Sequence, residues 1–180
     1  MIRPDRRRLL SQAAALAAPA LLLTRPAGAA VAQPDRLSFV HRHSGESLSI
    51  GWRLHGVCDP LALRRIERLL RDVRTGEVHP IDPALLDQLH RVVALTGTRA
   101  PIEVLSGYRS ERTNEMLRRR GGGGVARRSL HLEGRAIDVR LTDVPLATLR
   151  DAARSLVAGG VGFYPGAGFV HLDTGRARSW

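Results

Sequence analysis

The sequence predicts one α+β domain, in which an antiparallel sheet of about four strands has helices packed outside it. Two kinds of pattern lead to this prediction. Several short segments alternate apolar and polar residues, which is the period of a half-buried strand. Longer segments with a broad apolar stripe begin at an X-Pro pair, which is typical of the first turn of a helix. A chain of 180 residues is long enough for one such domain with its own core.

The first half of the chain predicts a β-hairpin followed by two helices. Residues 36–54 alternate in the manner of two strands joined by a turn. An Asp-Pro pair at Asp59 opens a helix that we expect to end near Gly76, and a second pair at Asp82 opens a helix to about Leu95. Three histidines in or beside the hairpin are expected at the surface, namely His41, His43 and His55.

The second half of the chain alternates strands and helices. The predicted elements are a strand at 101–105, a short helix capped by Ser110, a strand at 135–141, a helix at 144–157, and a closing hairpin of 161–163 and 169–172. A run of four glycines, residues 121–124, ends the short helix and is predicted to form a mobile flap. It is not a phosphate-binding loop, because no strand precedes it and no Lys-Ser/Thr follows it.

Composition and charge argue against a nucleic-acid-binding protein and against an internal disulfide bond. The formal net charge is +11, and every basic residue is an arginine. Such a charge would suit a nucleic-acid-binding protein, but the arginines are spread along the chain and aromatic residues make up only 4% of it. We therefore expect no nucleic-acid partner. The single cysteine, Cys58, excludes an internal disulfide bond.

Residues 1–32 have the features of an export signal, so the folded domain is expected to span residues 33–180. A cluster of arginines precedes an apolar run at residues 9–23, and a small-x-small cleavage pattern ends at Ala32. The pair Arg6-Arg7 resembles the twin-arginine signal, which predicts a periplasmic protein that meets the membrane only during export. An uncleaved anchor is the alternative, although the apolar run is shorter than the roughly 20 residues of a spanning helix.

Two histidines and one aspartate have the composition of a zinc site. Catalytic zinc keeps three protein ligands of this kind plus one water, and His131, Asp138 and His171 supply such a set. Ligand atoms on one zinc ion lie roughly 3–4 Å apart, whereas seven extended residues span about 23 Å, so the chain must reverse between His131 and Asp138. Glu133-Gly134 is a suitable turn, because glycine adopts turn conformations without steric cost.

Alternation along the two strands supports this set. Asp138 falls on the face opposite the apolar residues of its strand, and His171 shares a face with Asp173. Two strands of this kind, each with an apolar face and a polar ligand on the other, can form one metal-binding wall. Spacing alone equally allows a capped turn and an ordinary surface histidine.

Three separated motifs resemble a known family. They are Ser-x-His-x-x-Gly-x-Ala-x-Asp at 129–138, the Ser-Gly-Tyr-Arg-Ser turn at 106–110, and the ending Gly-Phe-Tyr at 162–164, Phe-Val-His-Leu-Asp-Thr-Gly at 169–175 and Trp180. The first looks like the motif of the zinc D-Ala-D-Ala peptidases and their hedgehog-like relatives. Together the motifs resemble the YcbK-like murein endopeptidases, over about residues 36–180. One departure is Val73, which stands where the family's Arg-Asp-x-Arg-Thr-Gly pattern has a histidine.

The resemblance implies a zinc-dependent peptidase with a hedgehog/D-Ala-D-Ala peptidase-like fold that cleaves peptide cross-links of the cell wall. It implies that Zn²⁺ is bound by His131, Asp138 and His171. It further implies that Arg109 stabilises charge on the scissile carbonyl, which a guanidinium can do without proton transfer. Ser129 and Arg109 would bind the substrate, peptidoglycan stem peptides.

The general base has two candidates. Asp173 is preferred because it shares a strand face with His171, and Glu133, on the predicted turn, is the alternative. Asp173 has a competing role as the residue that orients a ligand histidine.

Other functions remain as alternatives at this point. One is a non-catalytic, zinc-containing module that binds peptidoglycan, and another is a D-Ala-D-Ala carboxypeptidase. The sequence leaves the cleaved bond open, and it does not separate two roles for the arginines around the glycine run, a solvated face or contact with stem-peptide carboxylates. We expect a monomer.

Overall fold

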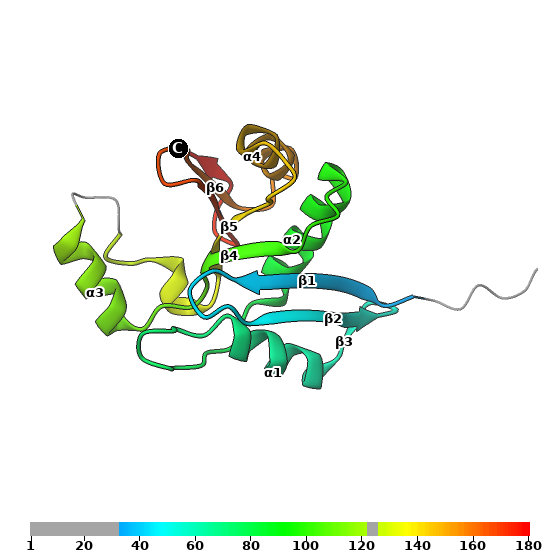
Figure 1. Cartoon of the computed structure of the whole chain (residues 1–180), viewed down its shortest axis with the longest axis horizontal. Helices are drawn as coiled ribbons and strands as arrows, with labels where there is room; N and C mark the ends of the chain where they lie inside the picture. Colours follow the sequence, from blue (N-terminus) through cyan, green and yellow to red (C-terminus); the bar gives the residue numbers. More distant parts are fainter. Residues whose placement is uncertain (1–32, 122–125) are drawn as a thin grey trace, which may run out of the picture. The chain divides into compact units, whose positions relative to one another are not determined.

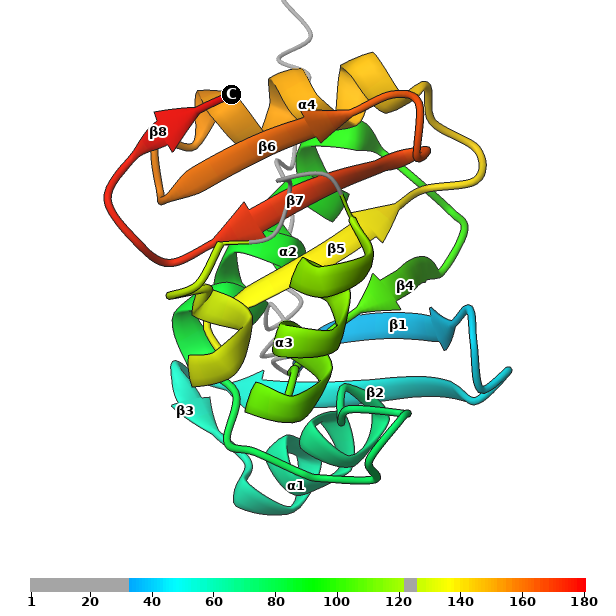
Figure 2. The same cartoon turned by 90° about the vertical axis from the view of Figure 1, so that its left-hand side faces the viewer.

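A single mixed sheet forms the centre of the described chain. The computed structural model describes residues 33–121 and 126–180. Eight strands lie in the order β3-β2-β1-β4-β5-β7-β6-β8 (Figure 2). Their bounds are β1 Asp35–His41, β2 Ser47–Leu54, β3 Val57–Cys58, β4 Ile102–Ser106, β5 Ala136–Arg140, β6 Gly160–Tyr164, β7 Phe169–Asp173 and β8 Arg178–Ser179. The predicted export signal and residues 122–124 of the predicted glycine flap lie outside the described residues.

The helices cover both faces of this sheet. They are α1 Pro60–Leu69, α2 Pro83–Thr96, α3 Glu111–Arg120, the 3₁₀ helix η1 Leu130–Glu133, and α4 Leu146–Ser155. Helices α2 and α4 pack against each other on one face, while α3 and η1 lie on the other (Figures 1 and 2). Within the described ranges, no helix combines the length and the apolar character needed to cross a membrane.

Three helices begin where the sequence predicts. The side chains of Asp59, Asp82 and Ser110 each accept a hydrogen bond from a backbone N–H in the first turn of α1, α2 and α3. Helix α2 ends at Gly97, whose φ of 63° lies in the left-handed region that glycine adopts at low cost. Capping chemistry therefore fixes these helix starts, as expected.

The sheet differs from the prediction in strand number and direction. It has eight strands instead of about four, and the β1–β4 and β6–β8 pairs are parallel. Strands β3 and β8 contain only two residues each, too few for an alternation pattern. The long connection through β2, α1 and α2 returns the chain to the direction of β1, so β4 pairs with it in parallel. The α+β class is confirmed, and the all-antiparallel sheet is wrong.

Helix α1 ends at Leu69, well before the predicted stop near Gly76. The reason is Asp72, whose buried carboxylate accepts hydrogen bonds from the N–H of Arg74 at 2.9 Å and from the N–H and Oγ of Ser110 at 3.0 and 2.7 Å. These bonds compete with helical continuation and tie the loop to the start of α3. The apolar periodicity that predicted the longer helix carries no information about these hydrogen bonds.

His41 is buried, with 1% of its surface exposed, which contradicts its expected place at the surface. Its Nδ1 accepts from the N–H groups of His43 and Ser44 at 3.3 and 3.4 Å, so the ring supports the hairpin turn. His43 and His55 are exposed, as expected.

Candidate metal centre

The register of two central strands places Asp138 opposite His171. Strands β5 and β7 are adjacent and antiparallel, and these two residues are direct partners in the ladder. Their neighbours Ile137 and Val170 point to the other face and are buried in the core. Because opposed strand residues have their Cβ atoms close together, alternation and register together put both polar side chains in contact.

His131 reaches the same place from η1. Ser129 caps this short helix by accepting the His131 N–H on its Oγ at 3.4 Å. Gly134 ends it with φ 65°, and a Cβ at that position would overlap the carbonyl of Pro80. Both the conformation and the close approach therefore require glycine. The chain reversal predicted at Glu133-Gly134 is confirmed.

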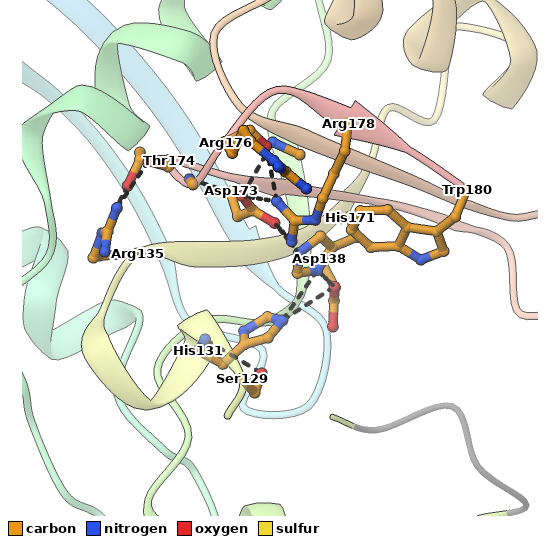
Figure 3. Close-up of polar contacts among 12 residues, drawn as sticks. Ser129, His131, Arg135, Asp138, His171, Asp173, Thr174, Arg176, Arg178 and Trp180 are labelled. Carbon is orange, nitrogen blue, oxygen red and sulfur yellow. Dashed lines mark hydrogen bonds and ion pairs between the residues drawn. The ribbon is translucent and has the colours of Figure 1, made fainter. Parts of the chain in front are cut away.

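The three side chains converge to the spacing of metal ligands (Figure 3). His131 Nε2 lies 3.3 Å from His171 Nδ1 and 3.3 Å from Asp138 Oδ1, and His171 Nδ1 lies 2.8 Å from Asp138 Oδ1. Atoms bound to one zinc ion at about 2 Å lie roughly 3–4 Å apart. In the described part of the chain, these residues form the one group of His, Cys, Asp and Glu side chains close enough to hold a metal. The donor set thus fits the metal that the sequence implied.

Each histidine is oriented by a hydrogen bond at the nitrogen that faces away from the cluster. His131 Nδ1 donates to the carbonyl of Gly107 at 2.7 Å, and His171 Nε2 donates to Asp173 Oδ2 at 3.1 Å. The other nitrogen of each ring faces the cluster, where it donates to Asp138 when the ring is protonated and offers a lone pair to a metal when the ring is neutral. Such outer contacts fix the tautomer that a metal requires.

Burial and mutual contact shift the pKa values of the three side chains. Burial lowers the pKa of His131, which favours the neutral ring. Burial alone would raise the pKa of Asp138, but the neighbouring His131, the hydrogen bonds from both histidines and the charge of Arg109 hold it well below its usual range. Burial also disfavours the charged ring of His171, yet its hydrogen bonds to Asp138 and Asp173 raise its pKa. Asp138 is therefore ionised at neutral pH, as a metal ligand must be.

Arg109 contacts the second oxygen of Asp138. Its Nη2 donates to Asp138 Oδ2, and its Nε donates to Ser106 Oγ at 2.8 Å. The two oxygens of Asp138 are thus divided between the histidine pair and the guanidinium. These two bonds use Nε and Nη2 of Arg109 and do not involve Nη1. Arg109 also lines the pocket above the cluster.

The two candidates for the general base lie in different surroundings. Asp173 lies beside the cluster, is fully buried, and touches His171. The side chain of Glu133 is largely exposed and pairs with Arg135 at 3.1 Å, and Glu133 does not line the pocket. The structure therefore brings Asp173, and not Glu133, to the ligands.

A pocket opens over the ligand cluster. Its walls combine polar residues that precede or form η1 with aromatic residues from β6, β7 and the segment after β8. They include Arg128, Ser129, Tyr164, Phe169 and Trp180. Tyr164 and Phe169 stack at 4.7 Å between ring centres, and Trp180 donates from Nε1 to the Tyr164 hydroxyl at 2.7 Å.

Two contributors to the site were not predicted from the sequence. Arg178 contacts Asp173 from β8, and the Gly107 carbonyl orients His131. Arg178 lies five residues after Asp173, but the chain has so many arginines that its position alone did not single it out. A backbone carbonyl leaves no signal of residue type at all.

Comparison with known proteins agrees with this geometry. A family model described as "Peptidoglycan L,D-endopeptidase MepK" (Peptidase_M15_2) matches residues 29–180. The chain belongs to this family. A member of the M15 peptidases is metal-dependent, so the His131, Asp138 and His171 cluster is the candidate centre for the ion.

Similar proteins in this MepK family cover most of the chain. "Probable peptidoglycan L,D-endopeptidase MepK" of Haemophilus influenzae is 44% identical over 149 residues, which are 82% of this chain and 80% of the relative. "Peptidoglycan L,D-endopeptidase MepK" of Escherichia coli K12 is 40% identical over 178 residues, 98% of this chain and 97% of the relative. These matches confirm the resemblance to YcbK-like murein endopeptidases.

Proposed function

We propose that this chain is a zinc-dependent endopeptidase that hydrolyses the L,D cross-links of peptidoglycan. Family membership makes it a peptidoglycan endopeptidase of the metallopeptidase type. The relatives are named as L,D-endopeptidases, and this favours the L,D cross-link among the bonds that the sequence left open. The observation that carries the proposal is the convergence of two imidazoles and one carboxylate beneath a pocket.

Zinc suits this donor set better than magnesium or calcium does. Two nitrogen ligands and one carboxylate oxygen match catalytic zinc sites, whereas magnesium and calcium prefer all-oxygen sites. His131, Asp138 and His171 would hold the ion. When bound, zinc polarises a carbonyl and lowers the pKa of water to about 7.

Arg109 and Ser129 are proposed to act on the substrate. Arg109 lines the pocket and is held by Ser106 and Asp138, and its Nη1 can donate to the oxygen of the scissile carbonyl. Preorganised donors of this kind stabilise the charge that develops there. Ser129 lines the same pocket and can contact the stem peptide.

For Asp173, its contacts favour the orienting role over the role of general base. Its carboxylate accepts five hydrogen bonds, from His171, twice from Arg178, and from the N–H groups of Gly160 and Gly175. Burial alone would raise the pKa of Asp173, but the hydrogen bonds from His171, Arg178 and the backbone hold it well below its usual range. A carboxylate of such low basicity is poorly matched to taking a proton near neutral pH.

The test is digestion of defined muropeptides by the purified, zinc-loaded protein, followed by mass analysis. An L,D-linked dimer should be hydrolysed, while a D,D-linked dimer and a D-Ala-D-Ala pentapeptide should stay intact. His131→Ala is the matched inactive control. Cleavage of the pentapeptide alone would support the carboxypeptidase alternative. Binding to sacculi without cleavage of any substrate would support the non-catalytic module.

The location of the protein is part of the proposal. A periplasmic enzyme exported by the twin-arginine route would meet its substrate there, and a route for folded proteins suits a metal-binding domain. The Arg6-Arg7 pair and the pattern that ends at Ala32 support this.

A further inference from the structure

Arg178 joins the metal centre from the edge of the sheet. It lies on β8, which pairs in parallel with β6 through Gly160 and Val161. Its guanidinium makes two parallel hydrogen bonds to Asp173, from Nη1 to Oδ1 at 3.0 Å and from Nη2 to Oδ2 at 2.7 Å (Figure 3). This two-pronged geometry sets the plane of the carboxylate as well as its position.

Two glycines pack closely against the Asp173 carboxylate, and a larger residue at either position would crowd it. A Cβ at Gly160 would overlap both Asp173 Oδ2 and Arg178 Nη1, and one at Gly175 would lie 2.9 Å from Asp173 Oδ1. The same two glycines donate their N–H groups to Oδ1 at 3.0 and 2.8 Å. Two backbone donors and one guanidinium therefore surround the carboxylate, and Oδ2 is directed at the ring of His171.

The chain of contacts ends at a ligand atom. Asp173 Oδ2 accepts from His171 Nε2, and across the ring His171 Nδ1 faces Asp138 and His131. Trp180 flanks the same ring, with 5.4 Å between ring centres, and the Arg178 guanidinium lies 4.8 Å from the Trp180 ring centre. The orientation of the His171 ring thus depends on Asp173, and the orientation of Asp173 depends on Arg178.

We propose that Arg178 is a positioning residue of the metal centre, which acts through Asp173 to aim Nδ1 of His171 at the other two ligands. The inference rests on the proposed metal site and not on the proposed substrate. Arg178 itself does not need to touch the substrate or the ion.

The exposure of the two partners decides which measurement reports this role. The Asp173 side chain is fully buried, while 40% of the Arg178 side chain is exposed. Because the Arg178 end of this ion pair is partly solvated, its loss should cost less stability than the loss of a partner from a wholly buried pair. Asp173 also keeps two backbone donors and His171 when Arg178 is removed. The effect of losing Arg178 should therefore appear in metal affinity rather than in folding.

The experiment compares Arg178→Ala with Arg176→Ala. Arg176 lies two residues away, carries the same charge and contributes only its carbonyl to the cluster, through a bond from Arg178 Nη1 at 3.0 Å. Zinc affinity is measured by competition with a chromophoric chelator, without substrate. Loss of an outer contact of this kind typically weakens metal binding about 10- to 100-fold. We expect zinc affinity to fall about 10- to 100-fold in Arg178→Ala and by less in Arg178→Lys. Arg176→Ala should bind zinc with wild-type affinity.

Two further readouts separate positioning from a general loss of structure. The thermal midpoints of all metal-free variants should agree with that of the wild type. The absorption spectrum of the cobalt-substituted protein should change in Arg178→Ala and stay unchanged in Arg176→Ala, because it reports ligand geometry. Wild-type affinity in Arg178→Ala would overturn the proposal. So would an equal loss in both alanine variants, or a loss that is accompanied by unfolding and not relieved in Arg178→Lys. Because no substrate is present, a protein that binds zinc in this manner but cleaves no muropeptide would refute the proposed function alone.

Discussion

His171 and Asp173 lie on the same face of β7, and His171 Nε2 donates to Asp173 Oδ2 across 3.1 Å. This contact places the carboxylate behind a candidate metal ligand, on the side away from Asp138 and His131. It favours the orienting role proposed for Asp173 over the role of general base, and the two roles predict different measurements.

Asp173→Asn should weaken zinc binding about 10- to 100-fold, because an amide is a weaker partner for His171 Nε2–H. At saturating zinc, most of the cleavage activity should return. The measurements are chelator competition and muropeptide cleavage over a range of zinc concentrations. If zinc affinity is unchanged while turnover is lost, Asp173 is the base instead.

Arg109→Ala should keep zinc and fold but lose turnover. Removing one donor to a developing oxyanion typically costs about 100- to 1000-fold in rate, or roughly 3–4 kcal/mol. The rate constant for cross-link cleavage is measured beside zinc content, with Arg112→Ala, an exposed arginine on α3, as the control. Unchanged turnover in Arg109→Ala would remove it from the chemistry.

The wild-type protein should hold one zinc ion per chain. His131→Ala, Asp138→Ala and His171→Ala should each lose the ion, because each removes one of three converging donors. Elemental analysis after dialysis checks this, with His43→Ala, an exposed histidine, as the control. A variant that keeps full occupancy identifies a residue outside the ligand set.

Glu103→Gln should destabilise the fold in a pH-dependent manner. Hydrogen bonds from Arg140, at 2.7 and 3.0 Å, and from Arg42 hold the pKa of the Glu103 carboxyl below its ordinary value of 4.5. A carboxyl with a lowered pKa contributes stability above its unfolded-state value and loses it as the pH falls. The stability gap between wild type and Glu103→Gln should thus be widest above about pH 5, at roughly 1–3 kcal/mol, and shrink toward pH 3.

Urea unfolding of the metal-free proteins at several pH values checks this expectation. Glu115→Gln is the matched control, because Glu115 is exposed and pairs with Arg119 only within one helix. Its gap should be small at every pH. A gap for Glu103→Gln that is constant with pH would contradict the assignment.

Replacing Arg6 and Arg7 by lysine should retain the precursor in the cytoplasm, since the twin-arginine route reads that pair. Cell fractionation and immunoblotting measure it, and Arg3→Lys is the control. Normal periplasmic recovery of the double variant would exclude this route.

Much of the fold could be predicted because its signals are local. Asp59, Asp82 and Ser110 cap helices through their own side chains, and alternation in 135–141 identifies a strand. The early end of α1 at Leu69 could not be predicted, because Asp72 binds Ser110 from a distant segment. Parallel pairing of Phe39 with Ile102 depends on the path of the intervening helices, which no local pattern records.

For the candidate site, too, local patterns were predictable from the sequence and contacts between distant segments were not. Alternation and a glycine turn predicted that His131, Asp138 and His171 could meet, and their convergence agrees with this. Strand alternation favoured Asp173 over Glu133 but left Glu133 as an alternative, because the difference depends on which side chain the fold buries. The part played by Arg178 depends on the pairing of a two-residue strand.

Both outermost strands of the sheet, β3 and β8, contain only two residues. Long, flat outer strands offer rows of free N–H and C=O groups on which another chain can add a strand, and short ones offer few. Strands β3 and β8 themselves therefore present few such groups to another chain.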